Sequence, residues 1–297
     1  MISDNPFGVE PATPAAKMKL KSKGRIIYDL PAEAYFKRPG LSASALVNGC
    51  KSMLHMRHFM QTPSECTPAM RWGKLCHSAI LEPERFERDL AVFEGESKRG
   101  NEWKEFCEAN AGKEIVTVAE SAQLAAMIEA VHSRADAKAL LTEGRREVSA
   151  FWNMDGCGKC KGRLDVLSDN SICDLKTTGD ITRFQNTAAQ LLINVRVGWY
   201  QLGIREITGK LLPVYIIVVE QNAPFDVRVY EYESEALALG RDMAIKTAKR
   251  FRECQKAKSY PGVCTDIQTL RLPEWMTQQQ MNKVGASEME EMEADKL

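Results

Sequence analysis

The hydrophobic and polar positions follow a helical period over the N-terminal half of the chain. Ser42 and Ser44 are suitable N-caps for a helix that begins there, because a serine hydroxyl can accept from the free backbone N–H groups of a first turn. Apolar residues then recur every three or four positions, as on the buried face of a helix. Residues 41–141 are therefore predicted to be helical, with helices over 72–81, 101–110 and 119–141.

After position 145 the pattern changes to an alternation of polar and apolar residues, which is typical of strands with one buried face. A β-branched run over 213–220 indicates a central strand that is buried on both faces. Together these patterns predict an α/β fold with a central mixed sheet flanked by helices. The predicted order is strands over 147–152, 161–167 and 171–177, a helix over 182–208, strands over 213–220 and 226–233, and a helix over 241–255.

The two ends of the chain have compositions that do not predict a core. Residues 1–25 contain prolines, glycines and lysines without apolar periodicity, so we expect a flexible basic arm. The chain beyond Pro273 is rich in Gln, Met and Glu, and we expect 276–297 to be a mobile polar and acidic tail. A single domain is predicted over 26–275, with the strands and their helices over 145–258 as its core.

Composition limits the class of protein. The chain has 297 residues, 44% hydrophobic and 27% charged, as in globular domains with a sizeable core. No apolar run reaches the roughly 20 residues that span a bilayer, and the N-terminus lacks a secretory pattern, so we expect a cytoplasmic protein without a membrane partner. The nine cysteines are then expected as free thiols. Cys157 and Cys160 form a CxxC that we interpret as a hairpin tip, with a zinc hairpin as the alternative.

Charge leaves nucleic-acid binding open. The formal net charge is zero, which argues weakly against a nucleic-acid-binding protein. However, residues 17–25 and 241–258 are rich in Lys and Arg, while 288–295 is acidic. A locally basic surface is sufficient to attract phosphates.

The clearest chemistry lies on two neighbouring predicted strands. Asp165 is in KGRLDVL, and Asp174 and Lys176 are in the next strand, ICDLKTT. Side chains alternate along a strand, so Asp174 and Lys176 point the same way. Such a cluster can bind a hard divalent cation, since Mg²⁺ prefers one or two carboxylates with water and substrate phosphates. The pattern therefore suggests metal-assisted phosphodiester cleavage, with a surface Asp–Lys ion pair as the alternative.

Local motifs give the chain a resemblance to the PD-(D/E)XK nuclease superfamily and, within it, to the RecE-type exonuclease (exonuclease VIII) of phages and prophages. The motifs are GLSAS from Gly40, GKLCH from Gly73 running on to LEPE from Leu81, KGRLD from Lys161 and DLKTT from Asp174. The likeness extends over about residues 25–275. It implies a PD-(D/E)XK core and Mg²⁺ as the cofactor, with Mn²⁺ as a substitute.

The resemblance also implies roles for single residues. Asp165 and Asp174 are the expected metal ligands, together with the backbone carbonyl of Leu175. His77 would be a metal ligand or would position a metal-bound water, with a packed core histidine as the alternative. Lys176 would orient or deprotonate the attacking water, or stabilise the charged phosphorane.

Other residues near the motifs are candidates for supporting roles, each with a structural alternative. Glu147 would approach the metal site or form a salt bridge to Arg145 or Arg163. Tyr200 and Gln201, on the helix after the lysine strand, would cover the site or pack against the sheet. Trp72 and Trp199 would stack on DNA ends or, as we favour, pack in the core. The candidates are Glu147, Thr177, Tyr200 and Gln201 as supporting residues, Lys161, Arg163 and the helix over 241–258 as phosphate contacts, and Trp72 and Trp199 as aromatic contacts.

The chain departs from these relatives at two places. Relatives often carry a Gln four residues before a Tyr on the helix after the lysine strand, whereas Tyr200 here has Arg196 at that position and Gln201 beside it. Relatives with an iron–sulfur cluster place one Cys before the core and three closely spaced after it. Only Cys254 and Cys264 follow here, so we expect no iron–sulfur cluster.

These observations lead us to expect a Mg²⁺-dependent deoxyribonuclease that degrades one strand of linear double-stranded DNA from its ends. The resemblance implies 5′-to-3′ polarity, a 3′ single strand left for recombination, a ring-shaped homo-oligomer and a single-strand annealing protein as partner. Two alternatives remain: a RecB-like or endonucleolytic enzyme of the same superfamily, and a catalytically silent DNA-binding module with the same fold.

Overall fold

A computed structural model describes residues 24–62, 66–264 and 266–294 of the chain. The chain divides into two units, one up to Tyr260 and one from Pro261 onward, and each is described by itself. The arm expected over 1–25 lies almost entirely outside the described residues, which begin within it at Gly24.

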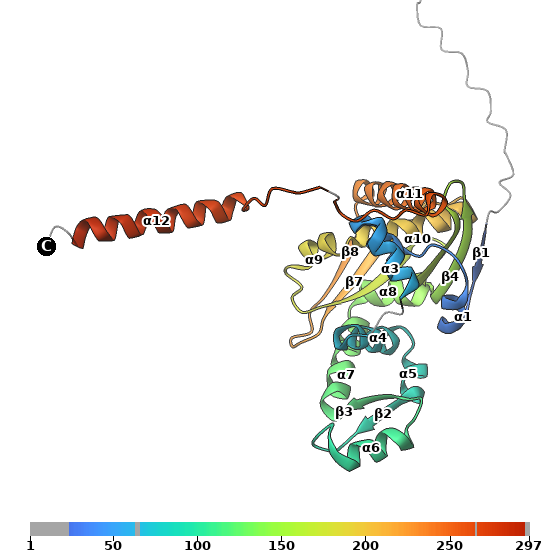
Figure 1. The fold of residues 1–297 in the computed structure, drawn as a ribbon. Coiled ribbons are helices and arrows are strands. Elements are labelled where there is room, and N and C mark those ends of the chain that lie inside the picture. The colour runs from blue at the N-terminus through green and yellow to red at the C-terminus, as the bar shows by residue number, and fades with distance from the viewer. Residues whose placement is uncertain (1–23, 63–65, 265, 295–297) are drawn as a thin grey trace, which may run out of the picture. The chain divides into compact units, whose positions relative to one another are not determined.

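A mixed sheet of six strands, in the order β1-β4-β5-β6-β7-β8, forms the centre of the first unit (Figure 1). β6 and β7 are parallel, and the other neighbouring strands are antiparallel. A parallel pair needs a long crossover, which α9 (Phe184–Gln190) and α10 (Ile193–Thr208) provide. The strands are β1 (Gly24–Ile27), β4 (Arg145–Met154), β5 (Gly158–Leu167), β6 (Ile172–Thr178), β7 (Val214–Glu220) and β8 (Val227–Glu231).

Helices cover both faces of this sheet (Figure 1). Ile216 and Val218 of β7 pack with residues of α10 and α11 in one core, and Ile217 and Val219 pack with residues of α4 and α7 in a second core. A strand that is apolar on both faces therefore lies between two helical layers, and the predicted mixed sheet flanked by helices is confirmed. The helices are α2 (Ala43–Lys51), α3 (Met53–Gln61), α4 (Pro68–Leu81), α7 (Val118–Ser133), α8 (Ala135–Glu143) and α11 (Ser234–Ala257).

Two of the predicted helices are each divided into two helices in the structure. The helix predicted over 119–141 is two helices, because Arg134 is extended and its guanidinium binds Asp136 and the carbonyl of Val227. The helix predicted over 182–208 is broken at Leu192, which has a left-handed backbone with φ of 51°. Neither break has a Gly or Pro at it, so the sequence pattern gave no signal for either.

The chain before β4 contains short elements that the periodicity did not predict. They are α1 (Ala32–Lys37), α5 (Pro83–Asp89) and a two-stranded parallel sheet of β2 (Leu90–Phe93) and β3 (Glu114–Thr117) on either side of α6 (Gly100–Ala109). Four-residue strands are too short to show a reliable alternation. Thr117 then begins α7 with a capping box, since its hydroxyl accepts from Glu120 N and the Glu120 carboxylate accepts from Thr117 N.

The hairpin between β4 and β5 contains the CxxC. Cys157 and Cys160 are buried in the core beside α10 and α11, and all cysteines in the described part of the chain are free thiols. Gly156 and Gly158 at the tip have φ of 76° and 72°, a left-handed conformation that glycine adopts easily. The interpretation as a hairpin tip is confirmed.

In the second unit, the segment that we expected as a mobile tail contains a helix, α12 (Glu274–Ala294). Its mobility remains a prediction. No helix among the described residues is both long and apolar enough to cross a membrane.

Candidate active site

Asp165 and Asp174 meet where β5 and β6 separate. The two strands pair only through Val166–Cys173 and Leu167–Ile172, and the same register continued by one step places Asp165 opposite Asp174. Beyond these two pairs, the backbone N–H of Leu175 donates to the side chain of Asp165, at 2.8 Å from its Oδ2, and not to the backbone of β5. The opening between the strands thus leaves room for two carboxylates and frees the Leu175 N–H to bind one of them.

Lys176 lies beside Asp174, as their spacing on the strand predicts. Its ammonium forms an ion pair with Asp174 Oδ2 and donates to the Leu175 carbonyl at 2.9 Å. Asp174 is only 2% exposed, so this ion pair with Lys176 is buried on the Asp174 side. Burial raises the pKa of Asp174 and the Asp165 carboxylate raises it further, while Lys176 opposes both effects. This carboxylate is therefore buried at a cost that the protein alone offsets only in part.

His77 reaches the two strands from α4, far away in the sequence. Its Nδ1 lies 3.5 Å from Asp165 Oδ2, and the imidazole is partly exposed. The His77 side chain is therefore at the carboxylate cluster and not packed in the core. The structure brings together Asp165, Asp174, Lys176 and His77, and the Leu175 carbonyl lies among them.

Glu147 and Arg163 form an ion pair next to this cluster. Arg163 Nε donates to Glu147 Oε2 at 2.5 Å, and burial raises the pKa of Glu147, with Asp165 raising it further. Glu147 has a left-handed backbone with φ of 52° at the strand position opposite Asp165. Both alternatives for Glu147 thus hold at once, since it approaches the site and pairs with Arg163.

Arg196, at the position where relatives often carry a Gln, is partly buried on α10, and its guanidinium donates to Ser44 Oγ at 3.0 Å. It interacts with Tyr200 one turn along α10 and with both Asp174 and Asp165. Burial lowers the pKa of Arg196, but these neighbours outweigh burial and raise it; burial also raises the pKa of Tyr200 to about 12. The spacing of four residues between Arg196 and Tyr200 was the available signal, because it places both on one helix face.

Gln201 is not part of the site. It is buried, its amide donates to the Leu212 carbonyl at 2.6 Å, and its oxygen accepts from Arg241. The structure does not bring Gln201 to the carboxylate cluster, because the next residue after Tyr200 on a helix points about 100° away from it. Thr177 likewise alternates away from Lys176 and accepts from Gln221 at 2.9 Å.

The structure does not place Lys161 for the phosphate contact that we expected. Its ammonium is buried and donates to the carbonyls of Tyr35, Phe36 and Arg38 at 3.3, 3.2 and 2.7 Å, so its three donors are used inside the protein.

The tryptophans pack as we favoured. Trp199 is fully buried, and Trp72 packs against the second core.

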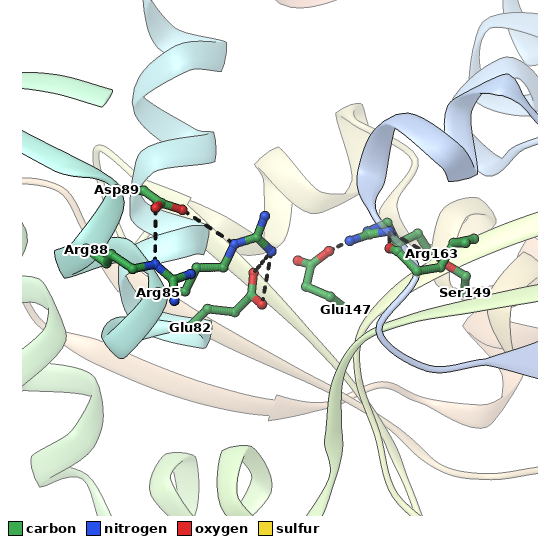
Figure 2. Close-up of polar contacts among 8 residues, drawn as sticks. Glu82, Arg85, Arg88, Asp89, Glu147, Ser149 and Arg163 are labelled. Atoms are coloured by element: carbon green, nitrogen blue, oxygen red, sulfur yellow. Dashed lines mark hydrogen bonds and ion pairs between the residues drawn. The ribbon is translucent and has the colours of Figure 1, made fainter. Parts of the chain in front are cut away.

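An open groove of about 630 Å³ leads to the cluster. Its walls come from α1, from α4 and α5, and from the Glu147–Arg163 pair. Arg85 lies between Glu82 and Asp89, with N–O distances of 3.4 and 3.7 Å, and Figure 2 shows these side chains across from Glu147 and Arg163. The groove is lined by Ala32, Phe36, Gly73, Lys74, His77, Ser78, Glu82, Arg85, Phe86, Asp89, Gly112, Glu114, Glu147 and Arg163.

The residues at the cluster suit a hard divalent cation that is completed by other ligands. No group of three or more His, Cys, Asp or Glu side chains in the described parts of the chain is arranged to hold a metal ion. Mg²⁺ needs fewer, because it keeps water and binds substrate phosphates alongside one or two carboxylates. Asp165, the buried Oδ2 of Asp174 and the Leu175 carbonyl are oxygen donors of this kind.

The mixed sheet, the crossover helices and the carboxylate–lysine cluster on diverging strands define a protein of the PD-(D/E)XK class. A family model described as a PDDEXK-like domain of unknown function, DUF3799, matches residues 42–273. The chain belongs to this family.

A solved structure supports the fold. A crystal structure of a "Putative exonuclease" from Eubacterium rectale superposes with a TM-score of 0.59 at 16% sequence identity, over 82% of this chain and 95% of that chain. At this identity the likeness shows the fold alone. No match was found among curated protein sequences.

Proposed function

We propose that the protein is a Mg²⁺-dependent deoxyribonuclease that degrades one strand of linear double-stranded DNA from its ends. The observation that carries the proposal is the cluster of Asp165, Asp174, Lys176 and His77 at the separation of two strands in a PD-(D/E)XK-like chain. The burial of Asp174 argues against the alternative of an ordinary surface ion pair with Lys176. Mn²⁺ is expected to substitute for Mg²⁺, since both accept oxygen ligands.

In this proposal each residue has a distinct task. Asp165, Asp174 and the Leu175 carbonyl hold the cation, which when bound polarises the scissile phosphate and lowers the pKa of water. Lys176 lies against two of these oxygens, so its amine is placed to orient or deprotonate the attacking water, or to neutralise charge on the phosphorane. His77 positions Asp165, and the partly buried positive charge of Arg196 favours the ionised form of both carboxylates.

The test is digestion of a blunt linear duplex with each strand labelled separately. Wild type should release nucleotides in Mg²⁺ and none in EDTA. Asp174→Asn should lower the rate at least about 100-fold, since a lost metal ligand removes several kcal/mol of transition-state stabilisation. The matched control is Asp169→Asn, the same change at an exposed turn between the same strands, which should leave the rate unchanged. Nucleotide release that survives Asp174→Asn would refute the site.

Two further measurements separate the alternatives. Cutting of covalently closed circles would favour an endonuclease over an enzyme that needs ends. Absence of both cleavage and Mg²⁺ binding by calorimetry would favour a silent DNA-binding module.

The finer properties are supported by the motif resemblance alone. These are 5′-to-3′ polarity, a 3′ strand left for recombination, a ring-shaped oligomer and an annealing protein as partner. The separately labelled strands report polarity, and sedimentation with and without DNA reports the oligomer. A monomer at all concentrations would contradict the ring.

A further inference from the structure

The large apolar side chain of Phe36 is exposed to solvent at the edge of the groove. It is 71% exposed, although it lies on a helix in which the preceding residue, Tyr35, is buried. Phe36 lines the same groove as His77 and Glu147. An exposed aromatic ring at the rim of a candidate active site is a place where a flat apolar ligand can stack.

The helix that presents Phe36 is anchored to the sheet. α1 has only six residues, too few to be stable alone. Lys161 of β5 binds three carbonyls at its C-terminal end, and its Nζ lies 4.8 Å from the centre of the Tyr35 ring. Arg163 of the same strand donates to the Leu30 carbonyl, just before the helix, at 2.8 Å.

The anchors come from the strand that carries Asp165. Lys161 and Arg163 precede Asp165 at intervals of two residues along β5, so one strand fixes both the helix and the carboxylate. Burying a cation is costly, and here Lys161 donates to backbone carbonyls around α1 while Arg163 donates to the Leu30 carbonyl and to the Glu147 carboxylate. The result is a fixed spatial relation between the Phe36 ring and the expected metal site.

We infer that Phe36 forms a stacking subsite for a nucleobase of the substrate strand whose phosphate is at the Asp165–Asp174 cluster. The inference rests on the proposed function, which brings a nucleic-acid strand into this groove. Every base has an aromatic face, so the contact would hold the strand without reading its sequence. Lys74, which is exposed in the same groove, supplies positive charge for a flanking phosphate, whereas Arg85 is paired with Glu82 and Asp89.

The test measures coupling between the ring and a base. Duplexes with a recessed or frayed end carry one abasic residue, moved stepwise along the strand, and binding is measured by fluorescence anisotropy in EDTA so that cleavage does not interfere. For the normal strand, Phe36→Ala should weaken binding about 5- to 100-fold, from the usual size of base–aromatic stacking. At one position of the abasic residue, the binding affinity of wild type should fall by the same factor. For that strand, Phe36→Ala should weaken binding no further.

Two control variants isolate the ring. Phe36→Trp should bind the normal strand like wild type, because it keeps an aromatic face. Leu54→Ala, which removes another exposed apolar side chain on α3, should change nothing. The inference is overturned if Phe36→Ala weakens all abasic strands as much as the normal one, or leaves binding unchanged, or changes the oligomeric state instead. Because binding is read in EDTA, failure of Mg²⁺-dependent cleavage is seen separately and would count against the proposed function.

Discussion

Gly73 offers a substitution that should raise stability and lower activity at once. It lies in the interior of α4, one turn before His77, and it lines the groove. A Cβ atom built on Gly73 has no heavy atom within 4 Å, and its backbone is not left-handed. A glycine inside a helix costs about 0.5–1 kcal/mol relative to alanine, so the chain keeps a destabilising residue where the fold has space for a methyl group.

Gly73→Ala is therefore expected to raise the free energy of unfolding by about 0.5–1 kcal/mol. For a unit of this size that corresponds to a rise in Tm of about 1–4 °C. The methyl group would project into the groove, where close approach of a DNA backbone needs a bare helix face. We expect kcat/KM for linear duplex to fall about 10- to 100-fold, as when a substrate is displaced slightly from its reacting position.

The assay combines thermal unfolding with nucleotide release from the same preparation. The matched control is Gly240→Ala, also inside a helix, where the added Cβ would lie 2.1 Å from the carbonyl oxygen of Asn194. That variant should lose stability by about 1–3 kcal/mol through overpacking. A lower Tm for Gly73→Ala than for wild type would refute the claim that the fold has room for a methyl group at this residue. A higher Tm with unchanged kcat/KM would show that the substrate does not approach α4 at this residue.

Two further predictions concern stability. Lys161→Met should lower the free energy of unfolding by about 2–3 kcal/mol, because buried carbonyls around α1 lose their donor. Urea denaturation measures this change, and the control Lys159→Met, at an exposed position of the same strand, should have little effect. Thr117→Ala should cost about 0.5–2 kcal/mol by removing the capping box of α7, and Thr117→Ser should retain most of the stability. Equal effects of Lys161→Met and Lys159→Met, or no loss in Thr117→Ala, would contradict the respective contacts.

Local spacing was sufficient to predict part of the site. The alternation of DLKTT placed Asp174 and Lys176 on one side of β6, and the short turn before it brought Asp165 alongside. Hydrophobic periodicity likewise predicted the central strand β7 and the layers around it. These features depend on residues that are close in sequence, where strand geometry fixes direction.

Spacing misled us where a side chain is used inside the protein. Lys161 was expected to contact phosphates because it is basic and precedes Asp165 by four residues on the strand, yet it anchors α1. Gln201 was grouped with Tyr200 because the two are adjacent, yet adjacent residues on a helix point in different directions. Residue type alone does not say which partner a polar group finds.

The sequence by itself determined the succession of strands and helices along the core and the carboxylate–lysine spacing, because both follow from the two-residue and 3.6-residue periods of the backbone. Only the tertiary structure decided that His77 reaches Asp165, that the charge of the partly buried Arg196 is felt by both carboxylates and that α1 holds Phe36 at the groove. Those contacts join segments separated by many residues, and their geometry depends on how whole helices pack on a twisted sheet, which no local pattern encodes.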